Sequence, residues 1–211
     1  MRREKLIVFA RYPRPGKAKT GLIDELGPWG AAKLHRCLTE HVIDQARQVG
    51  LSPGVGLEIY YRGGDQNLMR RWLGADLTFR SQGRGDRGNR MSRAFGASFE
   101  DGAGAVVLVG TACPDLTADV LARAFEGLVQ QDLVIGPALD GGYYLIGARR
   151  HVPELFVDIA WGTNEVLTST LRIASDLGLS VSLLEPLGDV DRAEDLERIE
   201  AWLEDERISV E

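Results

Sequence analysis

Short apolar runs rich in strand-forming residues alternate with helical segments along this 211-residue chain. The longest helical segment, 28–49, has apolar residues at the three- and four-residue spacing of an amphipathic helix. The sequence predicts strands at 5–11, 55–61, 76–81, 104–110, 132–138, 143–148 and 180–186. It predicts the other helices at 65–73, 88–99, 117–129, 164–177 and 192–204, with Thr117 as an N-cap. Alternation of this kind indicates an α/β fold with a mostly parallel sheet flanked by helices.

The turn sequence LDGG at 139–142 separates two of these strands. Because Asp-Gly and Gly-Gly are strong formers of tight hairpin turns, we expect an antiparallel hairpin late in the sheet. The chain contains no repeat, low-complexity segment or linker that would divide it, and 44% of its residues are hydrophobic. We therefore expect a single domain over residues 1–211.

Charge and hydropathy exclude several classes of protein. The 25 basic and 31 acidic residues give a formal net charge of -6, whereas a general nucleic-acid binder carries a basic excess. No apolar run approaches the ~20 residues needed to span a bilayer. The segment 1–13 lacks the long apolar stretch of a signal peptide. We therefore expect a cytoplasmic protein with neither a nucleic-acid partner nor a membrane span.

Ligands of open parallel sheets bind beyond the carboxyl ends of the strands. That rule directs attention to the loops after Arg11, Ser81, Gly110 and Ala138, and to the turn after Pro186. Charged side chains in these segments are the first candidates for a functional site.

The loop after the first strand is rich in positive charge. It carries Arg11, Arg14, Lys17 and Lys19 and no acidic residue. Gly16 lets the backbone approach a ligand, and lysine and arginine bind phosphate as a point charge and as a fork. The loop lacks the two glycines ahead of a Lys-Ser/Thr pair that mark a P-loop. It is either a phosphate site of another kind or a solvated basic loop.

The loop after the third strand carries arginines at three-residue intervals. These are Arg84, Arg87, Arg90 and Arg93. The interval can place several of them on one helix face, and the first backbone N–H groups of that helix can meet an anion. A charged surface helix explains the pattern equally well.

Acidic residues stand in two further segments. Asp140 is either a turn residue of the hairpin or a carboxylate of the site. Asp191, with Glu194 three residues later, matches a capping box in which aspartate replaces the usual serine or threonine. We therefore expect Asp191 to cap the last helix first and to bind a ligand second. Asp189 is the freer candidate.

The histidines and cysteines offer no catalytic pattern. His35 and His41 fall in the long helix, six residues apart and off a common face. Cys113 lies in one of the strand-end loops, but nothing near it in sequence marks an activated nucleophile. We expect all three to be structural.

Taken together, these loops resemble those of a known family. The chain is similar to the bacterial glycosyltransferase-like proteins related to phospholactate guanylyltransferase and, more distantly, to the molybdenum-cofactor nucleotidyltransferases. The matching stretches are 12–20, 82–91, 110–117, 136–147, 161–166 and 189–196, of which DGGYYLIG and the GT-x-CPDL frame are fairly specific. The resemblance implies the nucleotide-diphospho-sugar transferase fold, called GT-A, in which a Rossmann-like half binds a nucleotide.

The resemblance also implies roles for single residues. Nucleotide phosphates would be bound by Arg14, Lys17 and Lys19, and the loop sequences add Gly16 and Arg84 to this set. Lys19 and Asp140 would act in catalysis, Asp140 by orienting the acceptor. Asp189 and Asp191 would hold Mg²⁺ or Mn²⁺, with substrate phosphates and water as the remaining ligands.

Three departures from the family pattern bear on these roles. The family usually has aspartate where this chain has Ala112, and arginine where it has Gly21. The loop 85–91 also departs from the usual Gly-Asp-Leu-Gly-Glu-Arg-Met. Ala112 replaces an expected metal ligand, and Asp115 would substitute for it if the loop turned back.

The sequence leaves three functions open. The first is metal-assisted glycosyl transfer from a nucleotide sugar to a small-molecule acceptor. The second, favoured by the cationic first loop, is guanylyl or cytidylyl transfer to a phosphorylated or acidic small molecule. The third is nucleotide binding without catalysis, in a protein that has lost a metal ligand at Ala112. The base, the acceptor and the oligomeric state stay open.

Overall fold

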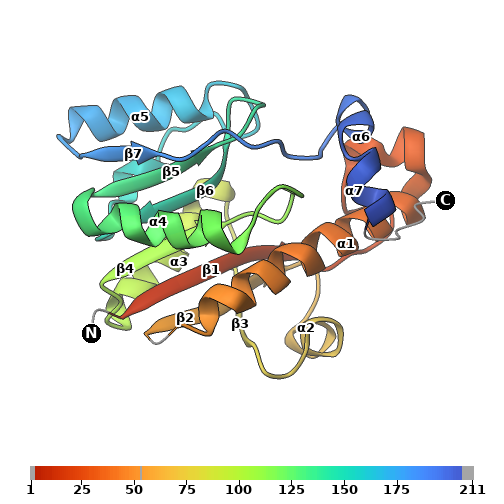
Figure 1. Ribbon diagram of the computed structural model, residues 1–211, viewed down its shortest axis with the longest axis horizontal. Helices are drawn as coiled ribbons and strands as arrows, with labels where there is room; N and C mark the ends of the chain where they lie inside the picture. Colours follow the sequence, from red (N-terminus) through yellow and green to blue (C-terminus); the bar gives the residue numbers. More distant parts are fainter. Residues whose placement is uncertain (1–2, 53, 206–211) are drawn as a thin grey trace.

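A computed structural model describes residues 3–52 and 54–205 of the chain (Figure 1). Within these ranges, seven strands form one sheet in the order β3-β2-β1-β4-β6-β5-β7. The strands are β1 Glu4–Arg11, β2 Val55–Arg62, β3 Thr78–Ser81, β4 Ala105–Val109, β5 Leu133–Pro137, β6 Tyr143–Ala148 and β7 Val181–Leu183. The predicted α/β fold with a mostly parallel sheet is confirmed.

One strand of the described sheet runs against the others. β6 pairs antiparallel with β5 and with β4, whereas the remaining neighbours pair in parallel. The turn between β5 and β6 closes with a hydrogen bond from the Ala138 N–H to the Gly142 carbonyl, at 3.0 Å. The predicted late hairpin is therefore confirmed. The carboxyl ends of the parallel strands and the start of β6 all meet at one edge of the sheet.

The α-helices agree with the predicted segments within a few residues, apart from the two ends of the chain, and two short 3₁₀ helices, η1 and η2, were not predicted. The helices are η1 Thr20–Leu22, α1 Ile23–Gly50, α2 Gln66–Leu73, α3 Arg87–Glu100, α4 Ala118–Gln130, η2 Pro153–Phe156, α5 Val166–Asp176, α6 Glu194–Arg198 and α7 Glu200–Asp205. α1 begins earlier than predicted and is kinked at Gly27, where φ is 64°. The last predicted helix is divided into α6 and α7. No helix within the described ranges combines the length and apolar character needed to cross a membrane.

Side chains near two helix starts test the predicted caps. The Thr117 hydroxyl accepts a hydrogen bond from the Val120 N–H at 3.4 Å, so Thr117 caps α4 as predicted. The Asp191 capping box is wrong. The Asp195 carboxylate instead accepts hydrogen bonds from the backbone N–H groups of Asp191 and its neighbour, at 2.9 and 2.8 Å. The Asp191 side chain is directed elsewhere, toward a lysine.

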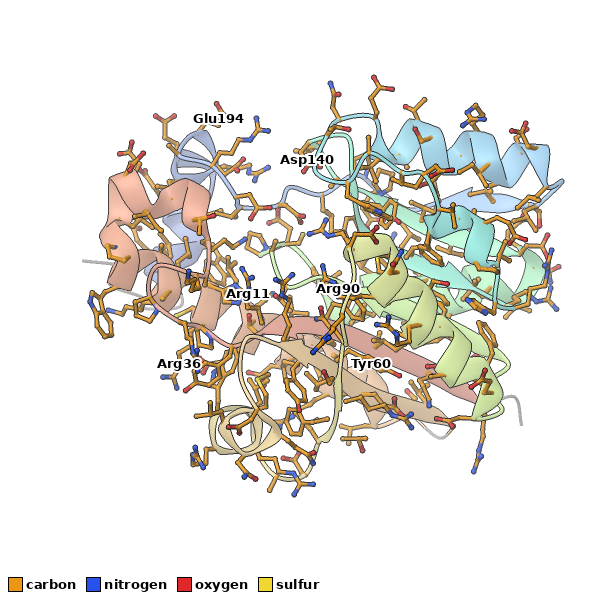
Figure 2. The ribbon with its side chains drawn as sticks, turned by 180° about the vertical axis from the view of Figure 1, so that it is seen from behind. Arg11, Arg36, Tyr60, Arg90, Asp140 and Glu194 are labelled. Atoms are coloured by element: carbon orange, nitrogen blue, oxygen red, sulfur yellow. The ribbon has the colours of Figure 1, made fainter. Side chains whose placement is uncertain are left out.

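Helices cover both faces of the sheet (Figures 1 and 2). Successive side chains of a strand point to opposite faces, so Leu6 and Val8 of β1 pack into one core and Ile7 packs into the other. The first core includes side chains of α1, α2 and α4, and the second includes side chains of α3, η2 and α5.

A third apolar cluster joins the two ends of the described chain. Leu22, Leu34 and Leu38, from η1 and the first half of α1, pack with Val190 and Ile199. Figure 1 shows α6 and α7 beside the start of α1, apart from the other helices. This packing holds the segment after β7 against the loop after β1.

Candidate functional site

A cavity of about 260 Å³ opens at the carboxyl edge of the sheet. It is bounded by residues at the ends of β1, β2 and β4, by the start of β6 and by the segment after β7. The positively charged residues that line it, among those described, are Arg11, Lys19, Arg62, Arg87 and Arg90. The acidic ones are Asp189 and Asp191. This combination of cations and paired carboxylates suits a phosphate-bearing ligand and a divalent ion.

Two of the arginines are placed by the register of the parallel sheet. Arg11 ends β1 and Arg62 ends β2, and the two are direct partners in the ladder. Removal from water, followed by the charge of Arg62, lowers the pKa of Arg11. The two guanidinium groups therefore lie close enough to repel each other.

Arg90 is held by the loop that precedes α3. Its guanidinium donates hydrogen bonds to the Gln82 side-chain oxygen and to the Asp86 carbonyl. Gln82 in turn donates to the carbonyls of Ala10 and Tyr60, at 3.1 and 2.9 Å, which ties this loop to the ends of β1 and β2. Desolvation, followed by the charges of neighbouring arginines, lowers the pKa of Arg90 to about 10. Figure 2 shows Arg90 and Arg11 near the middle of the molecule.

Lys19 and Asp191 form an ion pair inside the cavity. The Lys19 ammonium lies 2.8 Å from an Asp191 carboxylate oxygen, and the lysine side chain is only 5% exposed. Burial acts to raise the pKa of Asp191. The Lys19 charge, the hydrogen bond from Lys19 and the charge of Arg87 together outweigh it and hold that pKa below its usual range. The Lys19 backbone is left-handed, with φ of 45°, which is uncommon for a residue with a side chain. Such strain is concentrated at functional sites.

The absence of a side chain at Gly21 permits this arrangement. A Cβ at this position would lie 2.6 Å from the Asp191 carbonyl oxygen. The arginine expected from the family resemblance would therefore displace the segment that carries Asp191. The packing of the loop after β1 against the segment after β7 therefore requires glycine at position 21.

Asp189 differs from Asp191 in forming no ion pair among the described residues, although the charges of Lys19 and Arg87 act on it. No hydrogen bond to its carboxylate is present within residues 3–52 and 54–205. Desolvation, and then the nearby charge of Asp191, raise the pKa of Asp189 to about 6. The backbone between the two acids is fixed by a hydrogen bond from the Val190 N–H to the Ala112 carbonyl, at 2.9 Å. Because Ala112 also lines the cavity, a carboxylate at position 112 would share it with both acids.

The described residues contain no group of three or more histidine, cysteine, aspartate and glutamate side chains that could hold a metal ion. Asp189 and Asp191 nevertheless fit Mg²⁺ or Mn²⁺, because such ions are commonly held by one or two carboxylates together with substrate phosphates and water. Asp115 is exposed and does not line the cavity.

Several predicted phosphate ligands lie outside the cavity lining. They are Arg14, Gly16, Lys17 and Arg84, all of them exposed. Two of them support cavity or loop arginines through their backbone. The Lys17 carbonyl accepts a hydrogen bond from Arg11, and the Arg84 carbonyl accepts one from Arg93. Their binding of phosphate stays a prediction.

Asp140 is exposed in the turn between β5 and β6. Its carboxylate accepts a hydrogen bond from the Gly142 N–H at 2.8 Å, as expected of a turn residue. It lines a second hollow of about 560 Å³, which includes Thr163 and Arg192. Its charge contributes to the raised pKa of Asp189, so it stands near the acidic end of the main cavity. Its role in orienting an acceptor stays a prediction.

The structure adds cavity residues that sequence reasoning missed. Arg62 ends a predicted strand, and the rule applied to the other strand ends would have found it. His35, expected to be merely structural, lines the cavity and lies 3.0 Å from the Arg11 carbonyl through its Nε2 atom. Burial lowers the pKa of His35 to about 4, so the imidazole is neutral near pH 7. Cys113 is fully buried and its pKa is raised to about 12, as suits a structural residue.

Comparison with known proteins places this architecture in a family. The model of a bacterial family, described as "uncharacterized protein conserved in bacteria (DUF2064)", matches residues 45–163, more than half of the chain. The chain belongs to the DUF2064 family. No curated protein matches this DUF2064 sequence.

Solved structures share the fold of this DUF2064 protein. A Desulfovibrio desulfuricans protein, provisionally described as a nucleotide-diphospho-sugar transferase, is 35% identical with a TM-score of 0.86, over 96% of this chain and 88% of that one. CMP:2-keto-3-deoxy-manno-octonic acid synthetase is 15% identical with a TM-score of 0.57, and the match covers 97% of this chain and 99% of the synthetase. Glucosyl-3-phosphoglycerate synthase from Mycobacterium tuberculosis is 14% identical with a TM-score of 0.59, and the match covers 94% of this chain and 75% of the synthase. The predicted nucleotide-diphospho-sugar transferase fold is confirmed, while the closer relation to phospholactate guanylyltransferase stays a prediction.

Proposed function

We propose that this DUF2064 protein is a nucleotide-using transferase that moves a sugar from a nucleotide sugar to a small-molecule acceptor. The observation that carries the proposal is the cavity at the carboxyl edge of the sheet, where Lys19 and a cluster of arginines face the paired acids Asp189 and Asp191. In an open α/β sheet this edge is the usual ligand site. The 35% identical Desulfovibrio protein carries the matching provisional description.

Ligands of the more distant structures support a nucleotide in this cavity. The octonic acid synthetase is a complex with CTP, and the phosphoglycerate synthase is a complex with Mn²⁺ and UDP. Both share the fold of this chain, so the fold accommodates nucleotides with either number of phosphates. A divalent ion bound by Asp189 and Asp191 would neutralise charge on a pyrophosphate-type leaving group.

The chain's own residues would assist that reaction in distinct ways. The buried Lys19 ammonium, positioned by Asp191, would stabilise negative charge that develops on the leaving phosphate. Asp140, at the rim, would orient the acceptor. Arg14, Lys17 and Arg84 would contact only the parts of a ligand that project beyond the cavity, and Gly16 would let such a ligand approach the backbone.

The excess of positive charge favours a second candidate, nucleotidyl transfer from a nucleoside triphosphate. Five cationic residues and two acidic ones line the cavity in the described part of the chain. A triphosphate carries more negative charge than the diphosphate of a nucleotide sugar, so it would use more of these cations. The acceptor would then be a phosphorylated or acidic small molecule.

Calorimetric titration of metal-stripped protein tests the proposal. Nucleoside diphosphates, triphosphates and nucleotide sugars are added without metal, and then with Mg²⁺ or Mn²⁺. We expect nucleotide binding to strengthen at least about tenfold with metal, or about 1.4 kcal/mol. The Asp189→Asn variant should lose that gain. The tightest ligand, followed by an assay of its turnover, chooses between the two transfer reactions.

Two results would contradict the proposal. Binding that is equal with and without metal, with no turnover of any donor, would indicate a non-catalytic nucleotide-binding protein. Absence of binding by every nucleotide would remove the nucleotide from the function altogether.

A further inference from the structure

One side of the cavity is formed almost wholly by arginines. Arg11 and Arg62 come from the ends of adjacent strands, and Arg87 and Arg90 come from the first turns of α3. All four line the same cavity, and the charges of the other three each lower the pKa of Arg90. The four guanidinium groups therefore converge from three elements on one region.

Within the described residues, acidic groups act on these four arginines without forming ion pairs. The charge of Arg87 acts to lower the pKa of Asp189 and of Asp191, and the charge of Asp86 acts to raise the pKa of Arg90. Within the described residues, none of them forms an ion pair with a carboxylate, and Arg62 and Arg87 have no hydrogen-bond partner for their side chains. Several arginines elsewhere in this acidic chain do form ion pairs. Arg80 contacts Glu58 and Asp101, for example. Four like charges that converge without any ion pair are unfavourable, so the cluster is best explained by an anion that completes it.

The contacts that do hold the cluster leave its charge intact. Arg11 donates to the Lys17 carbonyl, and Arg90 donates to the Asp86 carbonyl and to the Gln82 amide oxygen. All three acceptors are neutral, so they orient the guanidinium groups without cancelling their charge. Such fixed forks match the geometry of phosphate oxygens.

We propose that Arg11, Arg62, Arg87 and Arg90 bind a terminal phosphate group, with its three free oxygens, of one of the substrates. The inference rests on the proposed function in that the same cavity serves the transfer reaction. The phosphate has two possible sources, the acceptor or the far end of a nucleoside triphosphate. In both cases the group that the arginines recognise is the same.

The first test measures binding of inorganic phosphate and of glycerol 3-phosphate at low ionic strength. The wild-type protein is compared with Arg62→Gln and Arg87→Gln, because neither side chain forms a hydrogen bond or ion pair within residues 3–52 and 54–205. Arg71→Gln is the matched control, since Arg71 is exposed on α2 and does not line the cavity. We expect each cavity variant to bind both probes at least about tenfold more weakly and the control to bind as the wild type does.

Thermal unfolding without ligand accompanies each titration. Removing one of several mutually repelling charges should leave the melting temperature unchanged or slightly higher, so weaker binding could not be attributed to unfolding. Equal binding of phosphate by the wild type and both variants, or no binding by the wild type, would overturn the proposal. So would a parallel loss of binding of unphosphorylated nucleosides, because the arginines would then stack on the base.

A second titration separates the two sources of phosphate and separates this inference from the proposed function. Glycerol 3-phosphate is added to protein saturated with a nucleoside diphosphate. Binding that persists and depends on Arg62 assigns the site to the acceptor, whereas competition that depends on Arg62 assigns it to the nucleotide. If no nucleotide binds but inorganic phosphate still does so through Arg62, the proposed function fails and the phosphate site stands.

Discussion

Gly21 illustrates how a single residue decides whether the two ends of the chain can meet. Its missing side chain lets the Asp191 carbonyl oxygen approach to within 2.6 Å of where a Cβ would be. Lys19, two residues earlier, then reaches the Asp191 carboxylate.

The Gly21→Ala substitution should therefore push the Asp191 segment away. We expect a loss of stability of about 1–3 kcal/mol, as for other overpacked sites, together with weaker nucleotide binding. Chemical denaturation and calorimetry measure the two effects. Gly56→Ala is the control, because a Cβ there would lie 3.8 Å from its nearest neighbour, an ordinary contact. Equal stability of the two variants would show that the close approach at Gly21 is relieved without cost.

Ala112 offers a test by restoring the carboxylate that the family resemblance leads one to expect. Ala112→Asp should place a third acid in the cavity with Asp189 and Asp191, and so strengthen metal-dependent nucleotide binding by about tenfold or more. Titration of Mn²⁺ in the presence of nucleotide measures the change. The exposed Ala75→Asp serves as control. An unchanged metal affinity would show that position 112 does not face the metal.

His35 makes stability depend on pH. Its pKa is about 4 in the folded protein because the ring is buried, against 6.5 for the exposed side chain. The unfolded chain therefore takes up a proton first, and the contribution of neutral His35 is present above pH ~6.5 and lost as pH falls toward ~4. The total is about 3 kcal/mol. The His35→Gln variant should lose less stability over this interval in urea unfolding. Identical pH profiles would argue against the low pKa.

At the scale of elements, the start of α4 provides the simplest check. Thr117 caps this helix by accepting a hydrogen bond from Val120, and its backbone lies in the extended region. Thr117→Ala should lower the free energy of unfolding by about 1 kcal/mol, and Thr117→Ser should restore most of it. Because α4 carries no residue of the cavity lining, ligand binding should not change in either variant.

Local sequence signals located most elements within a few residues. The periodicity of α1 and the turn residues between β5 and β6 depend on residues close together in the chain, so they can be recognised from the sequence alone. The errors lie where tertiary contacts intervene. α1 starts earlier than predicted because one further helical turn, at 23–26, precedes the predicted start at Pro28. The non-helical Gly27 stands between the two as a kink. Asp191 does not cap because Lys19 engages its carboxylate.

At the scale of the whole molecule, the third apolar cluster brings the acids to the basic loop. Ile199 is 1% exposed and packs with Val190, which lies between the two acids. Ile199→Ala should cost about 2–5 kcal/mol and also weaken nucleotide binding, since the acidic segment would no longer be fixed. Leu121→Ala, in the core under α4, should cost a comparable amount without altering ligand affinity. Equal effects of both variants on binding would mean that the cluster does not position the acids.

The sequence by itself determined the order of the elements, the cap at Thr117, the hairpin and the loops worth attention, because each depends on residues close together in the chain. Only the tertiary structure decided which charges meet. Lys19 and Asp191 are 172 residues apart and pair because an apolar cluster joins the ends of the described chain. Arg11 and Arg62 are neighbours because of the sheet register. Arg14 and Lys17 share the loop with Lys19 but do not line the cavity. The backbone conformation of the loop decides which side chains face the cavity, and the composition of the loop does not determine that conformation.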